Sequence, residues 1–164
     1  MVVRRASGDD AAAMARIMAA VAEEGLIATE PPVDVDARAE RFRAEIAGDG
    51  TAAYWVLEDG GPVLGLAGAH ETAIAGVLAL GMSIVPKARG RGGGRMLLAA
   101  IVEHARARDA HKLELDVWPE NARAIALYAS AGFTVEGLRR GHYRRRDGSL
   151  RSALVMARLL VSDD

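Results

Sequence analysis

The chain contains no cysteine, so disulfide bonds, thiolate metal sites and a cysteine nucleophile are all excluded. It has no uninterrupted apolar run long enough to span a bilayer, and its first residues, Met1 to Arg5, lead directly into a polar turn. A formal net charge of -1 gives no general attraction to nucleic acid or to anionic lipid. We therefore expect a cytoplasmic protein that binds neither nucleic acid nor membrane.

The composition, 51% hydrophobic and 26% charged over 164 residues, is typical of one globular domain with a sizeable core. Four segments have the apolar spacing of helices; they are expected to begin near Ser7 or Asp9, near Asp36, at the glycines of 92–94 and at Asn121. Strand patterns occupy Val2–Arg5, Tyr54–Glu58, Val63–Ala69, Val77–Val85, Lys112–Val117 and both sides of Asp147-Gly148. Leu26–Val35 should be irregular because it contains Pro31-Pro32. The pattern predicts one α/β domain with a mixed sheet.

The most informative segment is Arg89-Gly90-Arg91-Gly92-Gly93-Gly94-Arg95, which follows a strand that stops at Pro86 and opens an amphipathic helix. Glycines let the backbone approach a ligand closely, and the free N–H groups and dipole of a helix start favour an anion. The three arginines add positive charge, so the segment predicts a pyrophosphate site. A flexible surface loop is the alternative. A Walker-type loop is excluded because no Gly-Lys-Ser/Thr follows, and the segment comes too late in the chain for a Rossmann fingerprint.

Arg89 to Gly94 match the Gln/Arg-x-x-Gly-x-Gly/Ala motif of the GNAT superfamily of N-acetyltransferases. About thirty residues later, Asn121 to Phe133 resembles that family's second motif, Asn-x-x-Ala-x-x-Leu-Tyr-x-x-x-Gly-Phe. The pattern is closest to the ribosomal-protein alanine and polyamine acetyltransferase branches. The resemblance implies one N-acetyltransferase domain over residues 1–164, with a mixed, mostly antiparallel sheet of about seven strands and about four helices. It also implies acetyl-CoA as cosubstrate, no metal, and direct acetyl transfer to a primary amine.

The resemblance also assigns the residues that would bind the cofactor. Met82, Ser83 and Ile84 would hold the pantetheine arm, and a backbone N–H of that strand would polarise the thioester carbonyl. The pyrophosphate would be held by Arg89, Gly90, Arg91, Gly92, Gly93, Gly94 and Arg95. Neither Gly92 nor Gly94 is expected to pack the core. Asn121 has two compatible roles, as a helix cap and as a cofactor contact.

Tyr128 matches the family's usual acid, which would protonate the departing thiolate; its alternative is a core aromatic. For the base, Glu114 and Asp116 both point away from the apolar face of their strand. Asp116 stands where the ribosomal-protein alanine acetyltransferases carry a glutamate, so it is the candidate. A bridging water, or a purely solvated carboxylate, remains open for Asp116.

The acceptor is left open by the sequence: a small amine, an amino-acid-like compound and a protein N-terminus are all compatible, as is a homodimer. Acceptor choice is expected to reside largely in Glu23–Val35 and in the last hairpin, since in the family the first helical hairpin and the loop after it cover the acceptor cleft. Glu24 and Glu30 would there supply negative charge for a cationic amine. The run Arg144-Arg145-Arg146 is expected to be a solvated hairpin tip.

Two other functions compete with the acetyltransferase. One is a non-catalytic acyl-CoA-binding sensor on the same fold, and the other is a nucleotide-binding module. The four histidines show no metal-ligand spacing, and His104 and His111 are expected at the surface.

Overall fold

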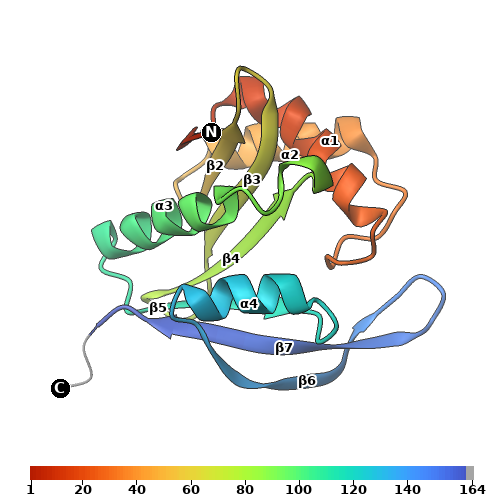
Figure 1. Ribbon diagram of the computed structural model, residues 1–164, viewed down its shortest axis with the longest axis vertical. Helices are drawn as coiled ribbons and strands as arrows, with labels where there is room; N and C mark the ends of the chain where they lie inside the picture. The colour runs from red at the N-terminus through yellow and green to blue at the C-terminus, as the bar shows by residue number, and fades with distance from the viewer. Residues whose placement is uncertain (162–164) are drawn as a thin grey trace.

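One seven-stranded sheet runs through residues 1–161, which the computed structural model describes, in the order β1-β2-β3-β4-β5-β7-β6 (Figure 1). Its strands are β1 Val2–Arg5, β2 Ala52–Glu58, β3 Val63–Glu71, β4 Val77–Ile84, β5 Lys112–Val117, β6 Thr134–Arg144 and β7 Leu150–Leu159. Within the described chain every neighbouring pair is antiparallel except β4 and β5. The expected mixed, mostly antiparallel sheet of seven strands is confirmed.

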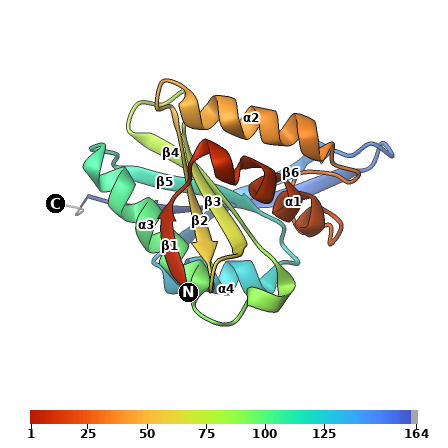
Figure 2. The ribbon, with the colours of Figure 1, turned by 90° about the horizontal axis from the view of Figure 1, so that it is seen from above.

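Helices cover both faces of this sheet (Figure 2). In residues 1–161 they are α1 Ala11–Ala22, α2 Val35–Ala47, α3 Gly93–Ala107 and α4 Ala122–Ser130. The α1–α2 pair packs on one face, against β2, β3 and β4, whereas α3 and α4 share the core on the other face. No helix in this part of the chain combines the length and the apolar character that crossing a membrane requires.

The strand β2 lies between the two cores and is buried on both faces. Tyr54 and Val56 pack into the cluster under α1 and α2, while Trp55 and Leu57 pack into the cluster under α3. This double burial explains why the strand reads as a continuous apolar run rather than as an alternation. Full burial of a side chain such as Leu57 contributes roughly 1.5–3 kcal/mol to stability.

The start of the first helix differs from the expectation in one detail. A 3-10 turn, Gly8–Asp10, comes between Ser7 and α1. The Ser7 N–H donates to Asp10 Oδ2 at 2.7 Å, and the Arg4 guanidinium donates to both Asp10 oxygens at 2.8 Å. Arg4 thereby lowers the pKa of Asp10 to about 2. Ser7, one of the two expected capping residues, is the N-cap of the 3-10 turn, and Asp10 rather than Asp9 directly precedes α1.

The parallel pair β4–β5 is short, and this shapes the rest of the molecule. The two strands pair only from Val77 to Ala79 on β4 and from Lys112 to Glu114 on β5. Beyond these residues β4 continues to Ile84, whereas β5 stays paired with β7 along its whole length. The strands therefore separate, and the facing backbone groups of each have no ladder partner across the gap.

Candidate active site

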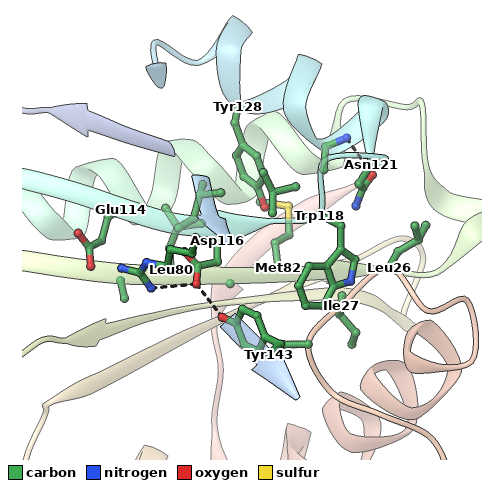
Figure 3. Close-up of a pocket in the computed structure, with 17 residues that line it drawn as sticks. Leu26, Ile27, Leu80, Met82, Glu114, Asp116, Trp118, Asn121, Tyr128 and Tyr143 are labelled. Carbon is green, nitrogen blue, oxygen red and sulfur yellow. Dashed lines mark hydrogen bonds and ion pairs between the residues drawn. The ribbon is translucent and has the colours of Figure 1, made fainter. Parts of the chain in front are cut away.

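A cavity of about 350 Å³ occupies the gap where β4 and β5 separate (Figure 3). One wall is β4 from Ala79 to Met82, and the other is β5 and the residues after it, from Glu114 to Trp118. The start of α4 closes the cavity on one side, and residues 26–28 and the β6–β7 hairpin close it on the other. Residues 26–28, 79–82 and 114–143, which are far apart in sequence, thus meet at one opening.

Tyr128 projects from α4 into this cavity with its hydroxyl end foremost (Figure 3). Its side chain is only 7% exposed and its ring lies 5.8 Å from that of Phe133. Burial raises the pKa of Tyr128 to about 12, so the hydroxyl keeps its proton at neutral pH. The Tyr128 hydroxyl forms no hydrogen bond within residues 1–161. It is therefore packed like a core aromatic and also presents a proton donor to the cavity.

Asn121, at the start of the same helix, also lines the cavity. Its Oδ1 accepts a hydrogen bond from the Ala124 N–H at 3.2 Å, which is the geometry of an N-cap. The cap orients α4 and thereby the position of Tyr128. The amide nitrogen of Asn121 forms no hydrogen bond within residues 1–161, so the two expected roles remain compatible.

Asp116 lies across the cavity and is already engaged. Its Oδ2 accepts a hydrogen bond from the Tyr143 hydroxyl at 2.6 Å and one from Arg139 Nη1 at 3.0 Å. Burial and the bond to Asp116 raise the pKa of Tyr143 to about 12. Oδ1 of Asp116 receives no hydrogen bond from the described residues, so one oxygen remains for a substrate or water. Tyr143 and Arg139 were not predicted, because only the pairing of β6 with β7, and of β7 with β5, brings them here.

The glycine-rich loop contains glycines of two kinds. Gly90 and Gly92 have positive φ values of 74° and 88°, and a Cβ at either position would meet nothing within 4 Å. Gly93 and Gly94 begin α3 in close contact: their Cβ atoms would lie 2.4 Å from Leu57 Cδ2 and 2.8 Å from Leu127 Cδ2. The first pair leaves the backbone open to a ligand, and the second lets α3 approach its neighbours. The expectation that Gly94 does not pack the core is wrong.

Two of the three loop arginines are engaged with carboxylates. Arg89 donates from Nε to the Ile84 carbonyl at 2.8 Å and pairs through both terminal nitrogens with Glu24 at 2.6 and 2.7 Å. This pairing lowers the pKa of Glu24. Arg91 pairs with Asp59 at 2.7 Å. Arg95 makes no hydrogen bond or ion pair with residues 1–161 and is exposed on α3.

The three β4 residues expected at the pantetheine arm are placed differently from one another. Met82 lines the cavity, Ser83 is buried and pairs with Leu66 of β3, and the Ile84 carbonyl is held by Arg89. Any contact from Ser83 or Ile84 to a ligand would therefore come from backbone at the open edge of β4. The contact of these residues with the pantetheine arm stays a prediction.

The loop between α1 and α2 is fastened over the cavity by arginines of the last hairpin. Each arginine donates one hydrogen bond to a loop carbonyl: Arg151 to Gly25 and Arg145 to Ala28 at 2.8 Å, and Arg146 to Pro31 at 2.9 Å. Glu30 adds an ion pair to Arg145 at 3.6 Å. The expectation of a solvated tip is thus wrong for Arg145, whereas Arg144 and Arg146 are exposed. Glu30, like Glu24, is neutralised by an arginine, and neither residue lines the cavity.

Trp118 lies under this fastening and connects it to the cavity. Its ring is 4.4 Å from the Arg151 guanidinium and 5.0 Å from the Tyr143 ring, and the side chain is 3% exposed. The Nε1–H of Trp118 is buried without an acceptor in the described residues. The indole therefore packs the two cavity-covering segments against β5.

The histidines lie apart from this site. His104 is partly buried, 5.1 Å from the Trp55 ring, and burial lowers its pKa, so the surface expectation is wrong for His104. His111 is exposed as expected. Residues 1–161 bring together no group of three or more His, Asp or Glu side chains that could hold a metal ion.

Known proteins similar in sequence are N-acetyltransferases. The model of the Acetyltransferase (GNAT) family matches residues 17–133. A curated relative, the [ribosomal protein bS18]-alanine N-acetyltransferase of Salmonella typhimurium, is 38% identical over 76 residues, which is 46% of this chain and 51% of the relative. The chain thus spans about half the length of the curated relatives that it matches first.

Solved structures resemble the chain over nearly its whole length. The ribosomal-protein-alanine N-acetyltransferase from Brucella melitensis superimposes with a TM-score of 0.85 at 27% identity, covering 97% of this chain and 99% of its own. A Salmonella typhimurium protein solved with its cofactor acetyl-CoA has a TM-score of 0.84 at 25% identity, with 98% and 94% covered. The expected fold is therefore confirmed.

Proposed function

The chain belongs to the GNAT family of acetyltransferases, and from this premise we propose that it is an acetyl-CoA-dependent N-acetyltransferase acting on a primary amine. The proposal takes residues 1–164 as one such domain. The observation that carries it is the separation of β4 from β5. At this one place it opens a cavity, frees the edge of β4 and exposes the Tyr128 hydroxyl, next to a helix start built for an anion.

The residues present fit acetyl-CoA, which would supply the acetyl group as a thioester. The N–H groups of Gly93, Gly94 and Arg95 are the first of α3 and have no intrahelical acceptor, so they suit a pyrophosphate. Gly90 and Gly92 leave open space at the same turn. Met82 and the free edge of β4 would hold the pantetheine arm between this turn and Tyr128.

The proton transfers are assigned to two side chains. Tyr128 would donate its proton to the departing thiolate, because its hydroxyl stays protonated and has no competing partner in the described chain. Asp116 would accept the proton of the amine through its free oxygen or through a water. Arg139 and Tyr143 would keep the Asp116 carboxylate in place while they leave that oxygen open.

The charge of the cavity favours an amine as the acceptor. Its charged lining residues in the described chain are Glu114, Asp116 and Arg139, which leaves one negative charge in excess. An alkyl amine, with a pKa of roughly 10, arrives as a cation. Small amines, amino-acid-like compounds and protein N-termini all meet this condition. The relatives that acetylate a ribosomal-protein alanine favour a peptide N-terminus, an acceptor that would put the protein in the cytoplasm.

Two further expectations remain predictions. Glu24 and Glu30 could contact the acceptor only if they left their arginines, so we assign them first to loop positioning. A homodimer could use the sheet edge at β6, whose residues are exposed almost throughout, including Val135 and Leu138. Light scattering at several protein concentrations would test this.

The test of the proposal is release of free CoA from acetyl-CoA in the presence of monoamines, amino acids and alanine-terminated peptides. A thiol reagent reports only CoA here, because the chain has no cysteine. Turnover with any of these acceptors supports the proposal. A rise in melting temperature with acetyl-CoA but no turnover favours the alternative, an acyl-CoA-binding sensor. No rise at millimolar acetyl-CoA contradicts both.

A further inference from the structure

Glu114 is a carboxylate in the cavity wall that forms no hydrogen bond or ion pair within residues 1–161. It shares one face of β5 with Lys112 and Asp116, opposite the buried leucines. Both of those neighbours are paired with β6: Lys112 with Glu136 at 2.6 Å and Asp116 with Arg139 at 3.0 Å. Glu114 therefore lies between two ion-paired residues and has no charged partner of its own in this part of the chain.

The space around Glu114 is open because its neighbours across the sheet are small. Glu114 pairs with Ala79 of β4 on one side and with Ala157 of β7 on the other. Neither methyl group can reach or cover the carboxylate. In Figure 3 Glu114 lies at the end of the cavity away from Trp118, with Asp116 between them. The side chain is partly buried, so water screens its charge less than at a free surface.

We propose that Glu114 is a cation-binding subsite that recognises a second positive charge on the acceptor. This inference rests on the proposed function, because the first amine is the one that receives the acetyl group at Asp116. Glu114 and Asp116 are two residues apart on a strand, so the two charges would lie roughly 7 Å apart. A short diamine and a basic residue near a peptide N-terminus both carry this chemistry. Acceptors with a carboxylate at that distance would be disfavoured.

The test compares acceptors that differ only in the second charge. One pair is 1,4-diaminobutane and n-butylamine; the other is the dipeptide amides Ala-Lys and Ala-norleucine. In at least one pair the wild type should use the member with the second positive charge about tenfold better in kcat/KM, a factor expected for a hydrogen bond to a charged group. Glu114→Gln should lose this preference, because it lowers kcat/KM about tenfold more for the member with the second charge than for the member without it. The pair that shows the preference tells whether the second positive charge belongs to a diamine or to a peptide.

Glu103→Gln is the matched control, since it removes the same charge from an exposed position on α3, on the other face of the sheet. It should keep the wild-type preference. The inference is overturned if the wild type shows no preference, or if Glu114→Gln lowers kcat/KM equally for both members of a pair.

A binding measurement separates this inference from the proposed function. If no acceptor is turned over, the proposed function fails, and calorimetry with 1,4-diaminobutane and the Ala-Lys amide still decides the role of Glu114. Weaker binding of either probe to Glu114→Gln than to Glu103→Gln supports the subsite. Equal binding, or no binding to the wild type, overturns it. Circular dichroism of both variants checks that they fold.

Discussion

The two sides of the cleft are constructed in different ways. On the cofactor side, residues 82–95 form one continuous strand, turn and helix start, and their shape follows from local glycine geometry. On the acceptor side, residues 25–31 are held by arginines more than a hundred positions later in the chain. The first side can be recognised as a motif, whereas the second exists only after the sheet has formed. We therefore expect substitutions within residues 82–95 to affect acetyl-CoA binding. Substitutions of the hairpin arginines that hold residues 25–31 should affect acceptor binding.

Tyr128 lies where the two sides meet, and its substitution should have the largest effect. Tyr128→Phe removes only the phenolic oxygen, so packing against Phe133 and acetyl-CoA affinity should persist. The kcat should fall about 10²–10⁴-fold, the usual contribution of a general acid. Pre-steady-state kinetics, where chemistry limits the rate, should be used together with the melting temperature. A wild-type kcat would make Tyr128 a packing residue only.

On the cofactor side, Gly92 and Gly93 should respond differently to the same substitution. Gly92→Ala puts a side chain at a φ of 88° and should weaken acetyl-CoA binding by about tenfold or more, because the phosphate-facing N–H groups shift. Gly93→Ala should instead destabilise the fold by about 1–3 kcal/mol through overpacking against Leu57.

Calorimetry with acetyl-CoA and denaturant unfolding separate these two effects. A Gly92→Ala protein with full affinity would mean that the pyrophosphate site lies elsewhere. A Gly93→Ala protein that is stable but does not bind acetyl-CoA would show that Gly93 is needed for binding rather than for packing.

Asp116 tests whether the acceptor side contributes to chemistry. Asp116→Asn should lower kcat/KM at neutral pH by removing the proton acceptor, and this loss should be smaller than the loss of kcat in Tyr128→Phe. The loss should shrink as the pH approaches the amine pKa of roughly 10, because the amine then deprotonates unaided. Tyr143→Phe, which leaves the carboxylate in place, is the control and should have a smaller effect. The same loss at every pH would assign Asp116 to positioning.

The arginine fastening should give the smallest effect, limited to the acceptor side. Arg145→Ala removes a hydrogen bond to loop 25–31 and the ion pair with Glu30, and Arg151→Ala removes a hydrogen bond to the loop and the contact with Trp118. Either change should raise the acceptor KM about fivefold, while the acetyl-CoA affinity stays unchanged. Arg144→Ala, at an exposed neighbouring position, is the matched control. Equal changes for both ligands would show that the loop does not belong to one side alone.

Much of the fold could be predicted because its signals are local. Lys112–Val117 is a strand with the expected bounds, since apolar and polar residues alternate along it. The two predicted strands Tyr54–Glu58 and Val63–Ala69 do pair as neighbours, β2 with β3. The first helix was expected to begin near Ser7 or Asp9; Ser7 does cap a 3-10 turn, and α1 follows directly after Asp10, which Arg4 holds. The close packing of Gly94 was not predicted, because the residue that leaves no room for a side chain there is Leu127, on another helix.

The sequence alone was enough to determine the order of strands and helices, the glycine-rich turn and the family motifs around Tyr128, because each depends on residues within one or two turns of chain. Only the tertiary structure decided which charges are free. Glu24, Glu30 and Asp116 are engaged by Arg89, Arg145 and Arg139, respectively, whereas Glu114 has no charged partner within residues 1–161. Ion pairing depends on distances between side chains that the sheet brings together, and a carboxylate reads the same in the sequence whether or not an arginine lies beside it.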